Sequence, residues 1–190
     1  MTDHRSPRRR NRTPRPLDGA RLEELALAYV ARFSVSEAKL GAYLKRKLRE
    51  RGWDGEGDPP IAALVGRYAD LGYVDDAAFA RSKAGGLLRR GYGARRVDQA
   101  LIAAGISAEL REDVQAGRGE QRAAALAMAR KRRFGPFGVS APDPARREKQ
   151  IAALLRAGHP LDSARELVDA PTIEAAEEWV ATAMDEENFE

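Results

Sequence analysis

Apolar residues recur along the chain every three or four positions, which is the spacing of one face of an α-helix. Leu40, Leu44 and Leu48 form one such row, and Ile151 and Leu154 belong to another. Each row is followed by a glycine, the residue that most readily adopts the left-handed conformation found after a helix. The pattern therefore predicts amphipathic helices that end at glycines.

The glycines that end three of these helices are 53 residues apart each time, at Gly52, Gly105 and Gly158. A fixed period indicates a structural repeat. A further helical run precedes each of these helices and another follows it, so each copy contains three helices. The sequence predicts an all-α fold of three tandem three-helix repeats in an elongated, curved array. The expected repeats are residues 18–72, 73–117 and 118–170.

Two segments fall outside the repeat. Residues 1–17 contain six arginines and three prolines and almost nothing apolar, which predicts a disordered basic arm. Residues 171–190 predict an extra amphipathic helix with seven acids and no Lys or Arg. Because the whole chain carries a formal charge of +4, the remaining 170 residues carry +11. This basic body favours an anionic partner, either nucleic acid or an assembly that contains it.

The amino-acid composition excludes or disfavours several kinds of chemistry. The chain has no cysteine, which excludes disulfides and thiol nucleophiles, and its two histidines form no catalytic or metal-binding arrangement. We therefore expect no catalytic residue, no cofactor and no metal, and a nuclease is disfavoured because the acids are scattered or terminal. The sequence shows no signal peptide and no apolar run long enough to span a membrane, so we expect a cytoplasmic location.

The segment Gly91-Tyr92-Gly93 lies between arginines and raises the question of a phosphate-binding loop. Such a loop follows a strand and supplies Lys and Ser/Thr to the phosphates, whereas here a predicted helix precedes Gly91 and no such residues follow. We interpret the segment as a turn between helices. Asp75, just before a helical run, is interpreted as an N-cap, and Trp53 as a packing residue after a helix end.

Residues 72–106, GYVDDAAFARSKAGGLLRRGYGARRVDQALIAAGI, resemble the signature repeat of the RecX family of RecA regulators. The agreement is in the order and spacing of Gly72 to Asp76, Phe79-Ala80, Arg89 to Gly93, Arg95-Arg96, Leu101 and Gly105-Ile106. The flanking copies resemble that family's other repeats, so the likeness covers about residues 20–170. Lys83 and Ala84 depart from its usual aromatic-aliphatic pair, and Gly85-Gly86 replaces stronger helix formers.

The resemblance implies a non-enzymatic, monomeric protein that binds the RecA filament on single-stranded DNA and mainly inhibits its ATPase, recombinase and coprotease activities. Basic residues recur in all three copies, and they are interpreted either as a partner-binding stripe, with possible contact to single-stranded DNA, or as solvated helix faces. The candidates are Lys45, Arg46, Arg49, Arg89, Arg90, Arg95, Arg96, Arg130, Lys131, Arg132 and Arg133.

Two further hypotheses concern nucleic acid. The alternative function is direct DNA binding without RecA, because three-helix bundles with arginines near a turn also describe helix-turn-helix proteins. The other is that the acidic segment 171–190 folds back on the basic body and competes with an anionic partner. The arm's arginines either contact phosphates or only increase solubility.

Overall fold

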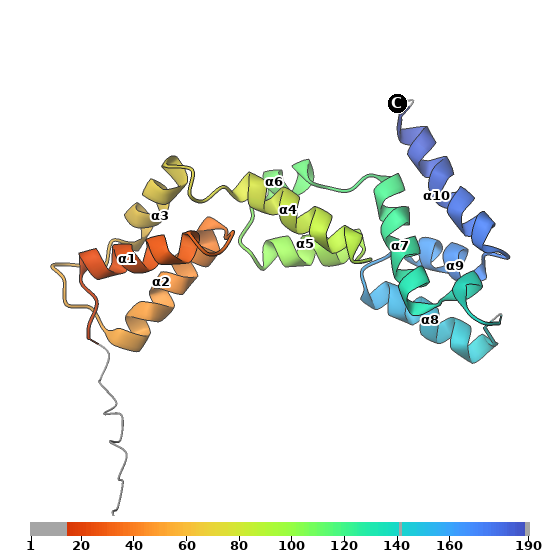
Figure 1. Cartoon of the computed structure of the whole chain (residues 1–190), viewed down its shortest axis with the longest axis horizontal. Helices are drawn as coiled ribbons and strands as arrows, with labels where there is room; N and C mark the ends of the chain where they lie inside the picture. Colours follow the sequence, from red (N-terminus) through yellow and green to blue (C-terminus); the bar gives the residue numbers. More distant parts are fainter. Residues whose placement is uncertain (1–14, 141, 189–190) are drawn as a thin grey trace, which may run out of the picture. The chain divides into compact units, whose positions relative to one another are not determined.

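The computed structural model describes residues 15–140 and 142–188, which form short helices joined by turns and longer loops (Figure 1). Within these ranges there is no β-strand, only an isolated bridge between Leu17 and Trp53. The predicted all-α class is therefore confirmed. The helices are α1 (Gly19–Val30), α2 (Glu37–Arg51), α3 (Ile61–Asp70), α4 (Asp76–Arg89), α5 (Ala94–Ile102), α6 (Ala108–Asp113), α7 (Arg118–Arg132), the 3-10 turn η1 (Gly135–Phe137), α8 (Pro144–Arg156), α9 (Leu161–Asp169) and α10 (Ile173–Asn188).

The helix ends follow the local chemistry that the sequence predicts. Asp75 caps α4, because its side-chain oxygen accepts a hydrogen bond from the Ala78 backbone N–H at 2.8 Å. The three glycines of the 53-residue period all have positive φ, as expected for residues that follow a helix: 83° at Gly52, 75° at Gly105 and 97° at Gly158. The N-cap at Asp75 and these turns are confirmed.

The N-terminal compact unit, described from residue 15 to Val74, contains α1, α2 and α3 around one apolar core. Leu17 is fully buried in this core, and its backbone N–H donates to the Gly52 carbonyl oxygen at 3.0 Å. Its own carbonyl accepts from the Asp54 N–H at 2.8 Å. The prediction that the arm extends to residue 17 is therefore wrong for Leu17, while residues 1–14 of that arm lie outside the described residues.

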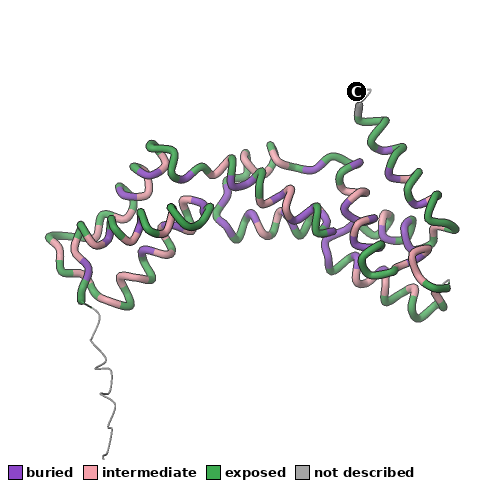
Figure 2. Tube along the Cα trace, in the orientation of Figure 1, coloured by how far each residue is buried: buried purple, intermediate pink, exposed green. Residues whose placement is uncertain are grey.

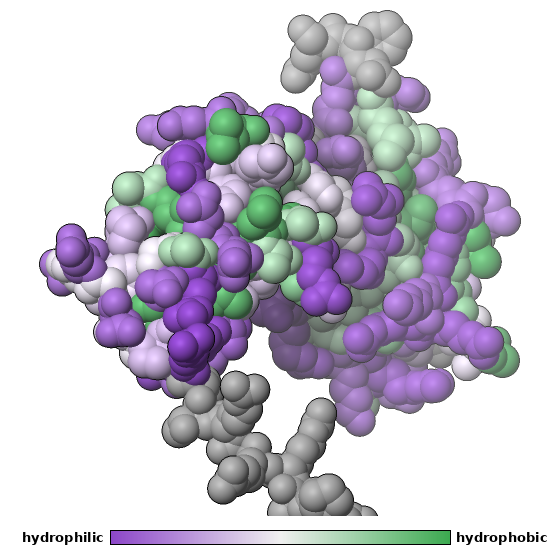
Figure 3. All heavy atoms as spheres, turned by 60° about the vertical axis from the view of Figure 1, so that its left-hand side comes forward, coloured by the Kyte–Doolittle hydropathy of each residue, from purple (hydrophilic) through white to green (hydrophobic). Residues whose placement is uncertain are grey.

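Trp53 packs against the same core, which confirms its interpretation as a packing residue, and its indole N–H donates to the Gly57 carbonyl at 2.8 Å. The face of this unit that comes forward in Figure 3 shows small hydrophobic areas separated by hydrophilic side chains. Phe33, Leu71 and Tyr73 are among the exposed large apolar residues of the unit.

The second compact unit begins at Asp75 and contains α4 to α10. Figure 2 shows buried positions alternating with exposed ones along its helices, as expected for amphipathic helices. One apolar cluster is formed mainly by α4 and α5, and a second by α7, α8, α9 and α10. Helix α7 contributes to both, because Ala124 belongs to the first cluster and Ala125 to the second.

The acidic C-terminal segment forms α10, which packs along α7 through small buried residues, Ala176, Val180 and Ala183. Gly119 of α7 allows this close contact, since a Cβ there would lie 2.7 Å from Cγ of Met184. None of the helices in the described ranges has the length and apolar character needed to cross a membrane.

Candidate functional site

The Gly91-Tyr92-Gly93 turn between α4 and α5 packs directly against α7 and against the turn between α8 and α9. A Cβ at Gly93 would lie 2.4 Å from the carbonyl carbon and oxygen of Gly158, and the Gly93 N–H donates to the Ala157 carbonyl at 2.9 Å. Gly91 has a φ of 86°, and a Cβ there would lie 2.9 Å from the Met128 backbone nitrogen. The glycines serve close backbone packing, which agrees with the predicted interhelical turn and gives no support to a phosphate loop.

His159 lies under the same turn and is buried, with 4% of its surface exposed. Its ring Nε2 is 3.0 Å from the Gly91 carbonyl oxygen, an acceptor, so Nε2 carries the proton and donates it. Burial lowers the pKa of His159 below its usual value, and the hydrogen bond to Gly91 opposes this effect more weakly. The neutral ring therefore links the turn between α8 and α9 to the turn between α4 and α5 through a donated hydrogen bond.

A hollow of about 530 Å³ opens between α4 and α5 beside this turn. Lys83, Leu87 and Arg90 are spaced by four and three residues, which places them on one face at the C-terminal end of α4. On α5, Arg96 and Gln99 follow the same rule. We term this feature the α4–α5 hollow, and its lining residues are Lys83, Leu87, Arg90, Tyr92, Arg96, Gln99, Ala100 and Ala103.

The α4–α5 hollow contains three cations and no acidic residue. None of these three side chains is joined to a carboxylate by a salt bridge in the described part of the chain. Tyr92 at its rim is 38% exposed, and Leu87, Ala100 and Ala103 supply apolar surface. Cations without a neutralising carboxylate create a local positive potential, so the hollow is suited to an anion.

The other face of α5 has a different character. There a second hollow, of about 430 Å³, is lined by Arg95, Asp98, Arg111 and Glu112 together with apolar residues. Arg111 donates to Asp98 at 2.5 Å, so opposite charges offset one another on this face. The four arginines of the second copy are therefore not equivalent, because Arg90 and Arg96 share the α4–α5 hollow while Arg95 lines the other hollow.

The cations predicted in the first copy lie on α2. Arg46 lies 3.7 Å from Glu50 and its guanidinium stands over the Tyr43 ring, 5.6 Å from the ring centroid. Lys45 and Arg49 are exposed on the same helix. These side chains form a solvated cationic face in the N-terminal unit.

In the third copy, Arg130 forms a salt bridge with Glu177 of α10 and stands over Phe137. Lys131, Arg132 and Arg133 are exposed, and Arg133 has a left-handed backbone with φ of 57°. Arg132 and Arg133 line a further hollow, of about 370 Å³, together with Arg146. Arg132 and Arg133 therefore line the same hollow, whereas Arg130 does not line it and is paired with Glu177.

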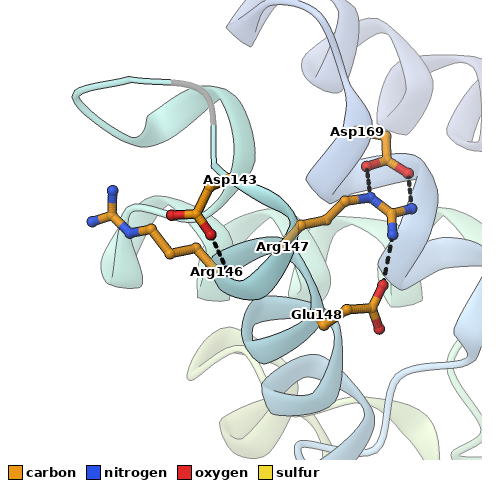
Figure 4. A network of polar contacts seen from close by, with 5 residues as sticks. All are labelled: Asp143, Arg146, Arg147, Glu148 and Asp169. Carbon is orange, nitrogen blue, oxygen red and sulfur yellow. Dashed lines mark hydrogen bonds and ion pairs between the residues drawn. The ribbon is translucent and has the colours of Figure 1, made fainter.

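Other cations have structural partners, and Figure 4 shows the clearest case. The Arg147 guanidinium of α8 donates two hydrogen bonds of 2.5 Å to Asp169 at the end of α9, and a third of 2.8 Å to Glu148. This hydrogen-bonded pair lowers the pKa of the Asp169 carboxyl group. Arg146 points away from these acids in the same view. Arg147 thus fixes helix packing, whereas Arg146 faces the hollow of Arg132 and Arg133.

Sequence reasoning did not include Lys83, Tyr92, Gln99 or Arg146 among the site residues. Lys83 could have been found from its spacing, since it lies seven residues before Arg90 and so on the same helix face. Arg146 gave no such signal, because it meets Arg132 and Arg133 only through the fold. Among the described residues, no three His, Cys, Asp or Glu side chains gather as metal ligands.

The fold and the site define a class: an all-α protein of short packed helices whose surface carries unpaired cations suited to an anionic partner. Comparisons with known proteins narrow this class to one family. A family model described as "RecX, second three-helix domain" matches residues 75–114, the segment that contains α4, α5 and α6. The regulatory protein RecX of Myxococcus xanthus (strain DK1622) is 31% identical over 176 residues, covering 87% of this chain and 91% of that protein.

The regulatory protein RecX of Mycobacterium sp. (strain KMS) is also 31% identical, over 94% of this chain and 97% of that protein. In structure, the chain is similar to the crystal structure of RecX from Lactobacillus salivarius, with a TM-score of 0.62 and 16% identity over 86% of this chain and 96% of that one. The chain belongs to the RecX family of regulatory proteins.

Proposed function

We propose that this protein binds the RecA filament assembled on single-stranded DNA and lowers its ATPase, recombinase and coprotease activities. Membership of a family of regulatory proteins supports this function. The observation that carries it in the structure is the set of cations without acidic partners, in the α4–α5 hollow and at Arg132, Arg133 and Arg146. A filament that carries DNA phosphates is an anionic target for such a surface.

The protein acts by binding and without catalysis, as a monomer in the cytoplasm. Binding by several groups of helices lets one molecule contact the target at more than one place, which strengthens the association without requiring any single strong site. The predicted partner-binding cations remain the proposed contacts, with Arg90 and Arg96 the strongest candidates because they face one hollow. Arg130 is the weakest candidate, because Glu177 already neutralises it.

The first experiment measures single-stranded-DNA-dependent ATP hydrolysis by RecA from the same source, titrated with this protein well below one copy per RecA. We expect strong suppression at these ratios, because one bound molecule affects several filament subunits. A control without RecA measures binding to duplex DNA at the same salt concentration. Unchanged ATP hydrolysis together with tight duplex binding would contradict the proposed function and support the alternative, a DNA-binding protein that acts without RecA.

A further inference from the structure

We propose that the α4–α5 hollow is a binding site for single-stranded nucleic acid, in which Lys83, Arg90 and Arg96 hold a backbone phosphate and Tyr92 stacks on the adjacent base. The inference deepens the proposed function and rests on it for the identity of the strand. It places the contact with the strand at one hollow of the second compact unit and gives each lining side chain a role.

The charges of the hollow are the first argument. Lys83 lies within α4, Arg90 is the C-cap of that helix and Arg96 lies in the first turn of α5, so three cations face one space. No carboxylate lines this space, in contrast to the hollow on the other face of α5, where Asp98 and Glu112 are present. A phosphate would therefore meet cations without competition from an internal acid.

The uncharged lining is the second argument. Single-stranded nucleic acid is bound by combining a cationic path for the backbone with aromatic side chains that stack on bases. Tyr92 provides an exposed ring at the rim, and its backbone is held by a hydrogen bond from its N–H to the Leu87 carbonyl at 3.1 Å. Gln99 adds an amide able to bond a base edge, and Leu87, Ala100 and Ala103 provide apolar surface.

The position of Tyr92 is fixed by the turn that holds it. Gly91 on one side packs against the Met128 backbone, and Gly93 on the other packs against Gly158. A stacking residue held on a rigid turn loses little conformational freedom when it binds, so the contact is favoured over that of a flexible side chain. An acidic peptide would use the three cations but would gain little from Tyr92, and for this reason we favour the nucleic acid.

The test compares two triple variants of the full-length chain that change the net charge equally. The first replaces the cations of the hollow, Lys83→Gln, Arg90→Gln and Arg96→Gln. The matched control replaces three exposed cations of the same compact unit that lie outside the hollow and outside the proposed contacts, Arg81→Gln, Arg156→Gln and Arg165→Gln. Binding of a short labelled oligothymidylate without RecA is followed by fluorescence anisotropy at several salt concentrations, and circular dichroism checks the helix content of both variants.

We expect the first triple variant to weaken binding at least tenfold and to reduce the dependence of affinity on salt, because fewer counterions are released. The control variant should weaken binding less than threefold. Equal losses in the two variants would overturn the proposal, since they would show that only the overall charge matters.

A second comparison separates stacking from charge. Tyr92→Leu should weaken binding of oligothymidylate about tenfold, in the range seen when an aromatic side chain that stacks on a base is removed. The same variant should bind an abasic strand as well as the original protein does, because that strand has no base to stack. If Tyr92→Leu binds oligothymidylate with unchanged affinity, no base stacks on Tyr92 and the proposal is wrong. If polyglutamate displaces the labelled strand at the same concentration as unlabelled oligothymidylate does, the hollow is a site for acidic protein and the proposal is also wrong.

Parallel measurements of RecA ATP hydrolysis keep the two proposals distinct. If the unmodified protein suppresses ATP hydrolysis but the hollow variants bind oligothymidylate normally, the hollow proposal fails and the proposed function stands. If binding depends on the hollow while ATP hydrolysis is unaffected by the unmodified protein, the proposed function fails and the hollow proposal stands.

Discussion

Gly93 is a residue at which a single added carbon would disturb the packing of the second compact unit. Its missing Cβ makes room for the Gly158 backbone, which cannot move away as a flexible side chain could. Gly86, in the last turn of α4, has the opposite surroundings, with no atom outside its own helix within 4 Å of the Cβ position. The two glycines therefore look alike in the sequence but have different structural roles.

Replacing Gly93 by alanine should lower the free energy of unfolding by about 2–3 kcal/mol, because the clash with Gly158 forces the turn and the α8–α9 connection apart. Gly86→Ala is the control, and it should raise the free energy of unfolding by about 0.5–1 kcal/mol, since alanine favours a helix interior. Urea unfolding followed by circular dichroism measures both. A Gly93→Ala protein as stable as the original would show that the close approach is not required.

His159 makes stability depend on pH. Its pKa in the folded protein is lowered by burial, whereas in the unfolded chain it returns to about 6.5. The unfolded state therefore binds more protons, and the contribution of His159 to stability is complete above pH 6.5 and is lost as the pH falls through 6.5 toward the folded pKa. We expect the melting temperature to fall between pH 7.5 and pH 5.5.

The conservative variant His159→Gln keeps an amide donor for the Gly91 carbonyl but has no group that titrates in this range. Its melting temperature should change less over the same interval, and the difference between the two proteins isolates His159 from the carboxyl groups. His4, the other histidine, is present in both proteins. Equal changes in melting temperature for the two proteins would assign the pH dependence to other groups.

At the scale of elements, α10 is both a packing helix and an acidic cover for part of α7. Arg118 lies 3.4 Å from Glu186, the Gly119 N–H donates to Glu187 at 3.0 Å, and Arg122 donates to the Trp179 carbonyl at 2.6 Å. The contact of the acidic segment with basic residues agrees with the idea that it folds back on the body, while its competition with an anionic partner stays a prediction. Removing residues 171–190 would also expose the apolar surface of α7, so a single substitution is the cleaner test.

Glu177→Gln should free Arg130 and strengthen binding of oligothymidylate two- to fivefold at low salt, provided that the C-terminal end of α7 contacts the strand. The effect on stability should stay below about 1 kcal/mol, because both side chains of this pair are about half exposed. Glu178→Gln is the matched control, since it removes the same charge from the neighbouring position, which forms no salt bridge in the described structure. Equal strengthening by both variants would indicate a general effect of net charge, and it would contradict a specific role of the Arg130–Glu177 salt bridge.

The helices themselves were largely predictable, because they follow from local rules. The apolar spacing, the N-cap at Asp75 and the glycines with positive φ are properties of short segments, and the structure has each of them. The Gly85-Gly86 pair, expected to weaken its helix, is accommodated within a continuous α4. The pairing of Arg130 with Glu177 joins residues 47 positions apart, so no local pattern could reveal it.

At the scale of the whole molecule, the chain consists of two compact units that meet in sequence between Val74 and Asp75, two residues after the predicted end of the first repeat. Each unit has its own buried apolar residues. The predicted boundaries at 117–118 and 170–171 fall between consecutive helices of the second unit, and the repeat arrangement remains a prediction. The candidate cations were predictable as a group from their recurrence, but the sharing of one hollow by Lys83, Arg90 and Arg96 depends on how α4 meets α5.

The contact of the Gly91-Tyr92-Gly93 turn with residues 157–159 has a consequence for the order in which the protein is completed on the ribosome. The His159 ring bonds to a carbonyl 68 residues earlier, so the Gly91 carbonyl and the Gly93 N–H have left the ribosome well before their partners are synthesised. Until then these two backbone groups lack the partners that they have in the folded protein. A nascent chain stopped before residue 157 would keep the bond from Tyr92 to Leu87 but lack the contacts of Gly91 and Gly93 with residues 157–159, so the turn is fully fixed only after these residues have been synthesised.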